Sequence, residues 1–134
     1  MTEVVNVSAG SNANIVGNYQ GLKFSSAVTV GGEVLPNVPG ASTGSWVVLK
    51  NQVGLQQNGI WFVDQVGTAG PTGLKWSLSR KGQANNLKLG DCVLNRNNAT
   101  TPLQFLTVST TPDWQSNFVV GVSNMSFTVL GNLS

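Results

Sequence analysis

Histidine is absent from this sequence, and charged residues and cysteine are scarce. The missing histidines remove the commonest general base, the Ser-His-Asp arrangement and the imidazole ligands of metal sites. The single cysteine, Cys92, excludes an intrachain disulfide and leaves too few ligands for a recognisable zinc site. We therefore expect neither a bound metal nor another cofactor.

Carboxylates are the remaining catalytic option, because glycosidases need only two of them. The acids that could form such a pair are scattered along the chain, and no motif links them: Glu33, Asp64, Asp91 and Asp113. A catalytic cysteine would need a histidine partner, so Cys92, in a strand-like run, is expected to be a buried thiol that acts as a small hydrophobe. The sequence predicts that the protein is not an enzyme.

Charge is also too sparse for several kinds of partner. Only 9% of the residues are Asp, Glu, Lys or Arg, and Arg80-Lys81 is the one adjacent basic pair, whereas nucleic-acid binding requires a basic cluster.

No apolar stretch reaches the 18 residues of a membrane span. The N-terminus has no charged region followed by an apolar one, so we expect no signal peptide and synthesis in a cytoplasm. The neutral surface, rich in Asn, Gln, Ser and Thr, fits a stable β domain or a surface covered by partners.

Helical periodicity is missing as well, and 16 glycines and 5 prolines interrupt the chain. What remains is a series of short apolar or alternating runs, which is typical of strands in a sandwich or barrel. These runs are Val4–Val7, Asn14–Val16, Leu22–Val30, Trp46–Lys50, Ile60–Gln65, Leu74–Arg80, Leu89–Asn95, Leu103–Ser109, Phe118–Val122 and Met125–Leu130. We predict an all-β fold: a single antiparallel β-sandwich or barrel, jelly-roll-like, of about nine short strands.

The first part of the chain is polar and weakly patterned. We interpret residues 1–20 as an N-terminal arm or a weak strand, and residues 21–134 as a single β domain. A long loop rich in Gly, Pro and Ser follows at Gly31–Ser45. Neither Met1–Gln20 nor this loop is expected to build a core of its own, so both are predicted to become ordered on a neighbouring molecule.

Two of the runs are apolar on both faces: Trp46-Val-Val-Leu49 and Ile60-Trp-Phe-Val63. Because side chains alternate across a strand, both faces of each must be covered. A second sheet covers one face, and a loop, an arm or a neighbouring subunit must cover the other. Trp46, Trp61 and Phe62 are therefore candidate residues of a protein interface, with the domain's own core as the alternative for the two tryptophans.

The other two tryptophans occur in different settings. Trp76 alternates with Leu74 and Leu78, so these three side chains are predicted to share one face toward the core. Trp114 lies in the loop-like segment Pro112-Asp-Trp-Gln115 and is the candidate for surface ligand contact. Aromatic platforms beside Asn and Gln donors suit carbohydrates, so a lectin-like sugar-binding module remains an alternative.

From Trp46 onward, the order of motifs resembles a small β module of tailed-bacteriophage virion proteins, tail-fibre-like and capsid-decoration-like. The carrying segments are Val48-Leu-Lys-Asn-Gln52, Asn58-Gly-Ile-Trp-Phe-Val63, Trp76-Ser-Leu-Ser-Arg80, Leu89-Gly-Asp-Cys-Val93 and Phe127-Thr-Val-Leu130. The pairing of Lys-x-Gln with Asn-Gly-Ile is its most specific part. The acidic loops common in the module are missing here.

This resemblance implies an all-β virion structural protein and carries no catalytic residues. A single module without a coiled-coil shaft suits a capsid cement or decoration protein, which would bind itself as a homo-oligomer and bind the major capsid protein or other virion proteins. A tail- or head-fibre component that contacts the host surface, with a host-surface glycan as a partner, is the alternative. The expected location is the virion.

Overall fold

The strands make up nearly all of the regular structure in the computed structural model, which describes residues 4–81, 91–96, 103–109 and 119–133. Within these residues there is one short 3-10 turn, η1 (Leu55–Gln57), and the strands are β1 (Val4–Val7), β2 (Ala9–Gly10), β3 (Asn18–Tyr19), β4 (Lys23–Ser25), β5 (Trp46–Leu49), β6 (Gly59–Gln65), β7 (Ser77–Ser79), β8 (Cys92–Asn95), β9 (Leu103–Ser109) and β10 (Ser126–Leu133). The predicted all-β fold is confirmed.

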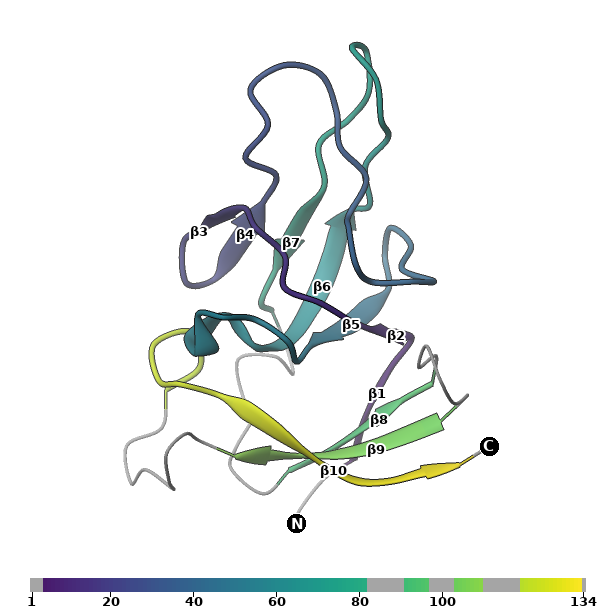
Figure 1. The fold of residues 1–134 in the computed structure, drawn as a ribbon, viewed down its shortest axis with the longest axis vertical. Coiled ribbons are helices and arrows are strands. Elements are labelled where there is room, and N and C mark those ends of the chain that lie inside the picture. Colours follow the sequence, from purple (N-terminus) through teal and green to yellow (C-terminus); the bar gives the residue numbers. More distant parts are fainter. Residues whose placement is uncertain (1–3, 82–90, 97–102, 110–118, 134) are drawn as a thin grey trace.

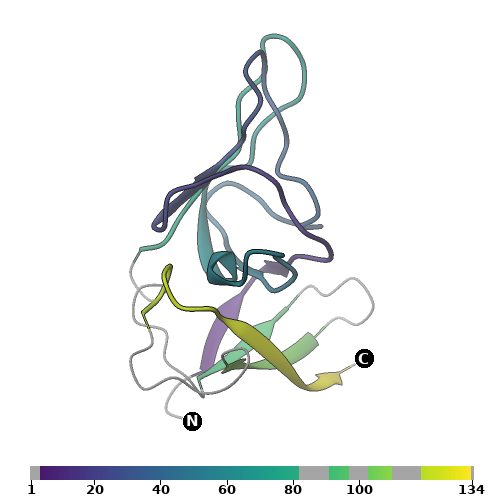
Figure 2. The same cartoon turned by 60° about the vertical axis from the view of Figure 1, so that its left-hand side comes forward.

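Two sheets pack against each other as a β-sandwich, and neither sheet closes into a barrel (Figures 1 and 2). The four-stranded sheet has the order β1-β8-β9-β10, and the six-stranded sheet has the order β2-β5-β6-β7-β4-β3. Two long loops rise from the six-stranded sheet as a narrow tip at the top of Figure 1. The first and last described strands, β1 and β10, both belong to the four-stranded sheet, at the opposite end of the molecule.

The N-terminal segment belongs to both sheets. Strand β1 pairs in parallel with β8, and after Ser8 the chain crosses to the other sheet, where β2 pairs in parallel with β5. These are the parallel pairs among the described strands, so the sheets are mixed and not purely antiparallel as predicted. The first 20 residues therefore include paired strands, and the buried side chains of Val5, Val7 and Ala9 show that this segment contributes to the core.

One hydrophobic core lies between the sheets, and we call it the inter-sheet core. It contains Val5, Val7, Val48, Ile60, Val93, Leu106, Val108 and Met125. Val48 and Ile60 are register partners on β5 and β6, and both are fully buried. Aliphatic, mostly β-branched side chains suit this space because they pack well between two pleated surfaces.

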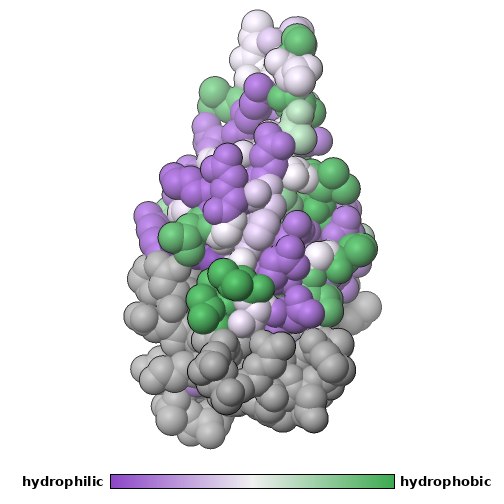
Figure 3. All heavy atoms as spheres, turned by 90° about the vertical axis from the view of Figure 1, so that its left-hand side faces the viewer, coloured by the Kyte–Doolittle hydropathy of each residue, from purple (hydrophilic) through white to green (hydrophobic). Residues whose placement is uncertain are grey.

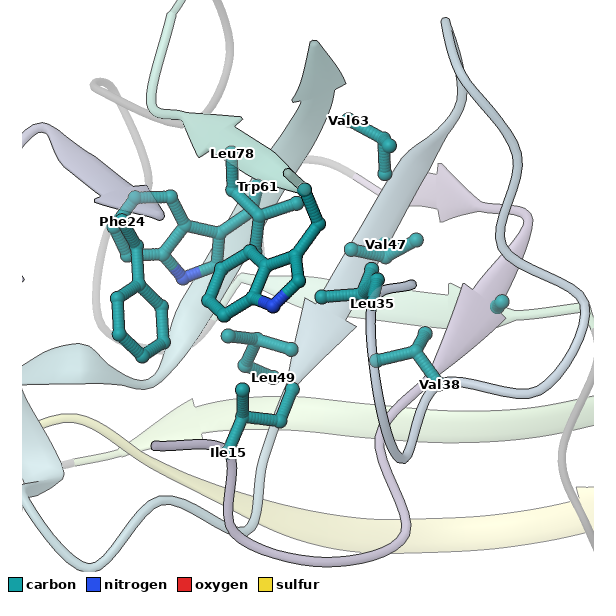
Figure 4. Packing of buried hydrophobic residues seen from close by; sticks show 11 residues of the cluster. Ile15, Phe24, Leu35, Val38, Val47, Leu49, Trp61, Val63 and Leu78 are labelled. Atoms are coloured by element: carbon teal, nitrogen blue, oxygen red, sulfur yellow. The ribbon is translucent and has the colours of Figure 1, made fainter. Parts of the chain in front are cut away.

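A second core lies on the other face of the six-stranded sheet, and we call it the aromatic core (Figure 4). It contains Ala9, Ile15, Phe24, Leu35, Val38, Val47, Leu49, Trp61, Val63, Trp76 and Leu78. Leu35 and Val38 belong to the loop Gly31–Ser45, which folds back over the chain's own sheet. The loop thus has a core to cover, and the expectation that it needs a neighbour for this is wrong.

Both faces of the two doubly apolar strands are therefore covered within the chain. Along β6, Ile60 enters the inter-sheet core and Trp61 enters the aromatic core, as alternation requires. Along β5, Val48 and Leu49 divide in the same way. The second sheet covers one face of these residues, and a loop of the same chain helps to cover the other, so they need no neighbouring subunit.

Several predicted strands are shorter than their sequence patterns. Leu22–Val30 contributes only the three residues of β4, and Leu74–Arg80 contributes only β7, which leaves Leu74 exposed and not in the core with Trp76. The predicted strand at Phe118–Val122 is wrong for its described part, because Val119 begins a turn closed by the Val122 and Ser123 amides. Short apolar runs near glycine are compatible with turns as well as strands.

Candidate interaction surface

Trp46 and Phe62 form an aromatic pair on two neighbouring inner strands of the six-stranded sheet. They are register partners on β5 and β6, and their ring centroids lie 5.1 Å apart at an interplanar angle of 68°. Both side chains are half-buried, and Trp46 packs against the inter-sheet core. Such an edge-to-face pair fixes the two rings relative to each other. The pair therefore presents a rigid apolar surface at the border of the core.

Lys81 adds a positive charge to this surface. Its ammonium nitrogen lies 3.7 Å from the centroid of the Phe62 ring, within the range of a cation–π interaction. Lys81 is exposed, so its charge remains available to solvent or to a partner. We define Trp46, Phe62 and Lys81 as the aromatic surface site. It offers apolar contact and one cation, which suits binding to a protein surface.

Trp61 does not belong to this surface, and the structure corrects its assignment as an interface residue. Its side chain has 0% exposure and lies among Tyr19, Phe24 and Arg80. Its indole nitrogen donates to the Gln57 carbonyl at 3.0 Å, so its polar atom is also satisfied inside the chain. Trp114, the candidate for surface ligand contact, lies outside the described residues.

Arg80 is a buried cation whose role sequence reasoning missed. With 3% exposure, it donates to the carbonyls of Gly21, Gln56 and Asn58 and to the Tyr19 hydroxyl. Its guanidinium carbon lies 4.1 Å from the Trp61 ring centroid. Burial lowers the pKa of Arg80 from its usual value, although the contact with Tyr19 opposes this. The one sequence signal was its place at the end of the alternating run Leu74–Arg80, which contains Trp76.

The motif residues that carry the resemblance have a structural role in the fold. Gln52 is buried and holds Ile15 in both directions: its Oε1 accepts from the Ile15 amide and its Nε2 donates to the Ile15 carbonyl, each at 2.8 Å. Asn58 Oδ1 accepts from the Gln52 amide, and Asn58 Nδ2 donates to the Met125 carbonyl. The segment Asn14–Val16, predicted as a weak strand, is thus held by a side chain and not by a strand partner.

Asn58-Gly59, a dipeptide typical of turns, is here the entry to β6. Asn58 is extended and follows η1, and Gly59 has a φ of 139°. A Cβ on Gly59 would lie 2.5 Å from Arg80 Nη1, and L side chains rarely adopt this positive φ, so both the contact and the backbone favour glycine here. Lys50 of the same motif is half-buried, which lowers the pKa of its amine.

The four acids considered for a glycosidase pair lie in different environments. Glu33 Oε1 accepts from the Trp76 indole at 2.7 Å and from the Ser26 hydroxyl at 2.8 Å, so it anchors the aromatic core. Asp64 is exposed, Asp91 is buried, and Asp113 lies outside the described residues. Cys92 is buried, as predicted. Within the described ranges, no three or more His, Cys, Asp or Glu residues gather where a metal ion could bind.

On the face shown in Figure 3, hydrophilic and hydrophobic residues are interspersed over the described part of the surface. Exposed apolar side chains are found at Val16, Leu22, Val30, Val34, Val53, Leu74, Val119, Val122 and Val129. Among the residues described, no helix is long and apolar enough to cross a membrane. Comparison with family models, with curated proteins and with solved structures found no match to this chain.

Proposed function

We propose that this protein is a structural protein of a bacteriophage virion: a cement or decoration protein that binds across capsid subunits as a homo-oligomer and stabilises the head. The proposal starts from the sequence resemblance, whose most specific residues are Gln52 and Asn58. Both hold the fold together through buried hydrogen bonds. Motif residues that hold the fold together and offer no reactive group fit a structural role.

The aromatic surface site is the observation that carries the proposal. Trp46 and Phe62 are half-buried and packed edge to face, and the Lys81 ammonium lies over the Phe62 ring. The chain as a whole has only 9% charged residues. Tryptophan is enriched among the residues that dominate binding energy at protein interfaces, and interface centres are depleted in charge. A capsid surface that offers apolar and hydrogen-bonding groups would fit this site.

The experiment uses phage particles from which the protein has been depleted. We expect these particles to burst at a lower temperature than complete ones, and added wild-type protein to restore the difference. Restoration should persist at high salt, because apolar burial is not screened whereas exposed charge pairs are screened over about 10 Å at 0.1 M. Particle melting, followed by release of DNA, measures both effects.

Two variants locate the contact. Trp46→Ala should weaken binding to depleted particles by about 2 kcal/mol, which is roughly 30-fold in affinity, as for a residue at an interface centre. Leu74→Ala removes an exposed apolar side chain outside this site and should bind like the wild type. If depleted particles are equally stable but fail to adsorb to cells, the protein is a fibre component. Binding of the isolated protein to glycans, without any effect on particles, would favour the lectin-like alternative.

A further inference from the structure

The outer strands of the two sheets differ greatly in length. Strands β2 and β3, at the two edges of the six-stranded sheet, have 2 residues each, and β1, at one edge of the other sheet, has 4. Strand β10, at its other edge, has 8 residues. Short edge strands protect a protein from pairing with other chains, whereas a long one is a template for it. Among the described strands, β9 alone pairs with β10.

The register shows which backbone groups of β10 point away from β9. The amide of Val108 donates to the Asp91 carbonyl, on the β8 side of β9. Backbone groups alternate in direction along an antiparallel strand, so the N–H and C=O groups of Val108 and of Leu106 both point toward β8. Their register partners on β10, Phe127 and Val129, therefore direct their N–H and C=O groups to the open edge. Thr128, between them, faces β9.

The composition of this edge differs from that of a protected one. Monomeric proteins protect long edge strands with lysine, other charges, proline or a β-bulge. Strand β10 has a bulge between Val129 and Gly131, but it contains no charged residue or proline, and no charged residue occurs anywhere from Trp114 to Ser134. Val129 is 49% exposed, and Phe127, which packs against the inter-sheet core, is only partly buried. Both side chains are thus available for further apolar contact.

We propose that two copies of this chain pair through β10, antiparallel and around a two-fold axis at Thr128, so that the two four-stranded sheets become continuous. In this register Phe127 lies opposite Val129 of the second copy, and Val129 opposite Phe127, which uses all the outward backbone groups of these residues. Aromatic and β-branched residues are favourable cross-strand partners, and so are two threonines. A strand that faces its own copy avoids like-charge repulsion only if it is neutral, which is the case here.

This inference rests on the homo-oligomer part of the proposed function and is independent of the capsid. The test is sedimentation of the isolated protein across the micromolar range. The wild type should approach twice the chain mass of 14.0 kDa. Thr128→Lys and Thr128→Glu should each remain monomeric, because the two-fold axis places like charges directly opposite each other. An equimolar mixture of the two variants should restore the dimer.

Thr72, exposed in a loop, provides the matched control: Thr72→Lys and Thr72→Glu introduce the same charges and should leave the dimer intact. Amide exchange supplies a second readout. The Val129 amide should exchange at least ten times more slowly in concentrated than in dilute solution, whereas the Thr128 amide, which faces β9, should not change. A wild type that is monomeric throughout, or a dimer insensitive to charge at Thr128, overturns the inference. A dimer that does not stabilise particles would instead contradict only the proposed function.

Discussion

The two cores of this molecule are closed in different ways. The inter-sheet core is enclosed by strands from both sheets, and its members are aliphatic side chains and a methionine. The aromatic core is enclosed by one sheet, the segment around Ile15 and the loop that carries Leu35 and Val38. A sheet satisfies its own backbone groups, but loops do not. The aromatic core therefore needs side chains that hold its loops in place.

Polar anchors around the aromatic core fulfil this need. Gln52 holds Ile15, Glu33 holds the indole of Trp76, and Arg80 holds the carbonyls of Gly21 and Gln56. Edge-to-face contacts, such as Phe24 with Trp76 at 5.2 Å, order the rings themselves. Removing an anchor should thus harm the aromatic core more than removing a methyl group harms the inter-sheet core.

Adjacent residues of β6 allow the sharpest comparison, because Trp61 and Ile60 face different cores. Trp61→Ala should lower the free energy of unfolding by about 3–5 kcal/mol, and Ile60→Val by about 0.5–1.5 kcal/mol. The Trp61 substitution also removes the ring that covers the buried Arg80. Urea denaturation followed by circular dichroism measures both changes. Equal losses of unfolding free energy for the two variants would show that the aromatic core depends on Trp61 no more than the inter-sheet core depends on Ile60.

Asn58 links the two cores, and its removal tests that link. Asn58→Ala removes the acceptor of the Gln52 backbone N–H and the donor to the Met125 backbone carbonyl. This loss should lower the free energy of unfolding by about 2–3 kcal/mol. Asn12→Ala, at an exposed position, is the matched control and should change stability by less than about 0.5 kcal/mol. Thermal unfolding compares the two variants, and similar melting temperatures would refute the role of Asn58.

Glu33 should show the smallest effect of the three, because its carboxylate is only partly buried. Glu33→Ala removes the acceptor of the buried Trp76 indole and should cost about 1–2 kcal/mol. Glu33→Gln keeps an amide oxygen for that bond and should lose clearly less. Near-ultraviolet circular dichroism reports on the order of the tryptophans, and it should weaken in the alanine variant alone. A glutamine variant as unstable as the alanine one would contradict this assignment.

Secondary structure was predictable where the hydrophobic pattern is strong and local. The strands at Val4–Val7 and Leu103–Ser109 have the predicted bounds, and those at Trp46 and Ile60 differ by one residue at an end. The patterns at Leu22–Val30 and Leu74–Arg80 predicted strands that are too long. A run of apolar residues does not show how many of them pair with a neighbouring strand. Leu74 is exposed for this reason, since its segment pairs with β6 only from Ser77 onward.

The sequence by itself determined the all-β class, the burial of Cys92 and the requirement that both faces of two strands be covered. These follow from local alternation and composition, which need no knowledge of distant residues. Only the tertiary structure decided what covers those faces, and hence that Trp61 is interior whereas Trp46 and Phe62 reach the surface. The same holds for the parallel strands of the N-terminal segment and for the carbonyls that surround Arg80. These features depend on contacts between residues far apart in the chain, whose free energies no local pattern contains.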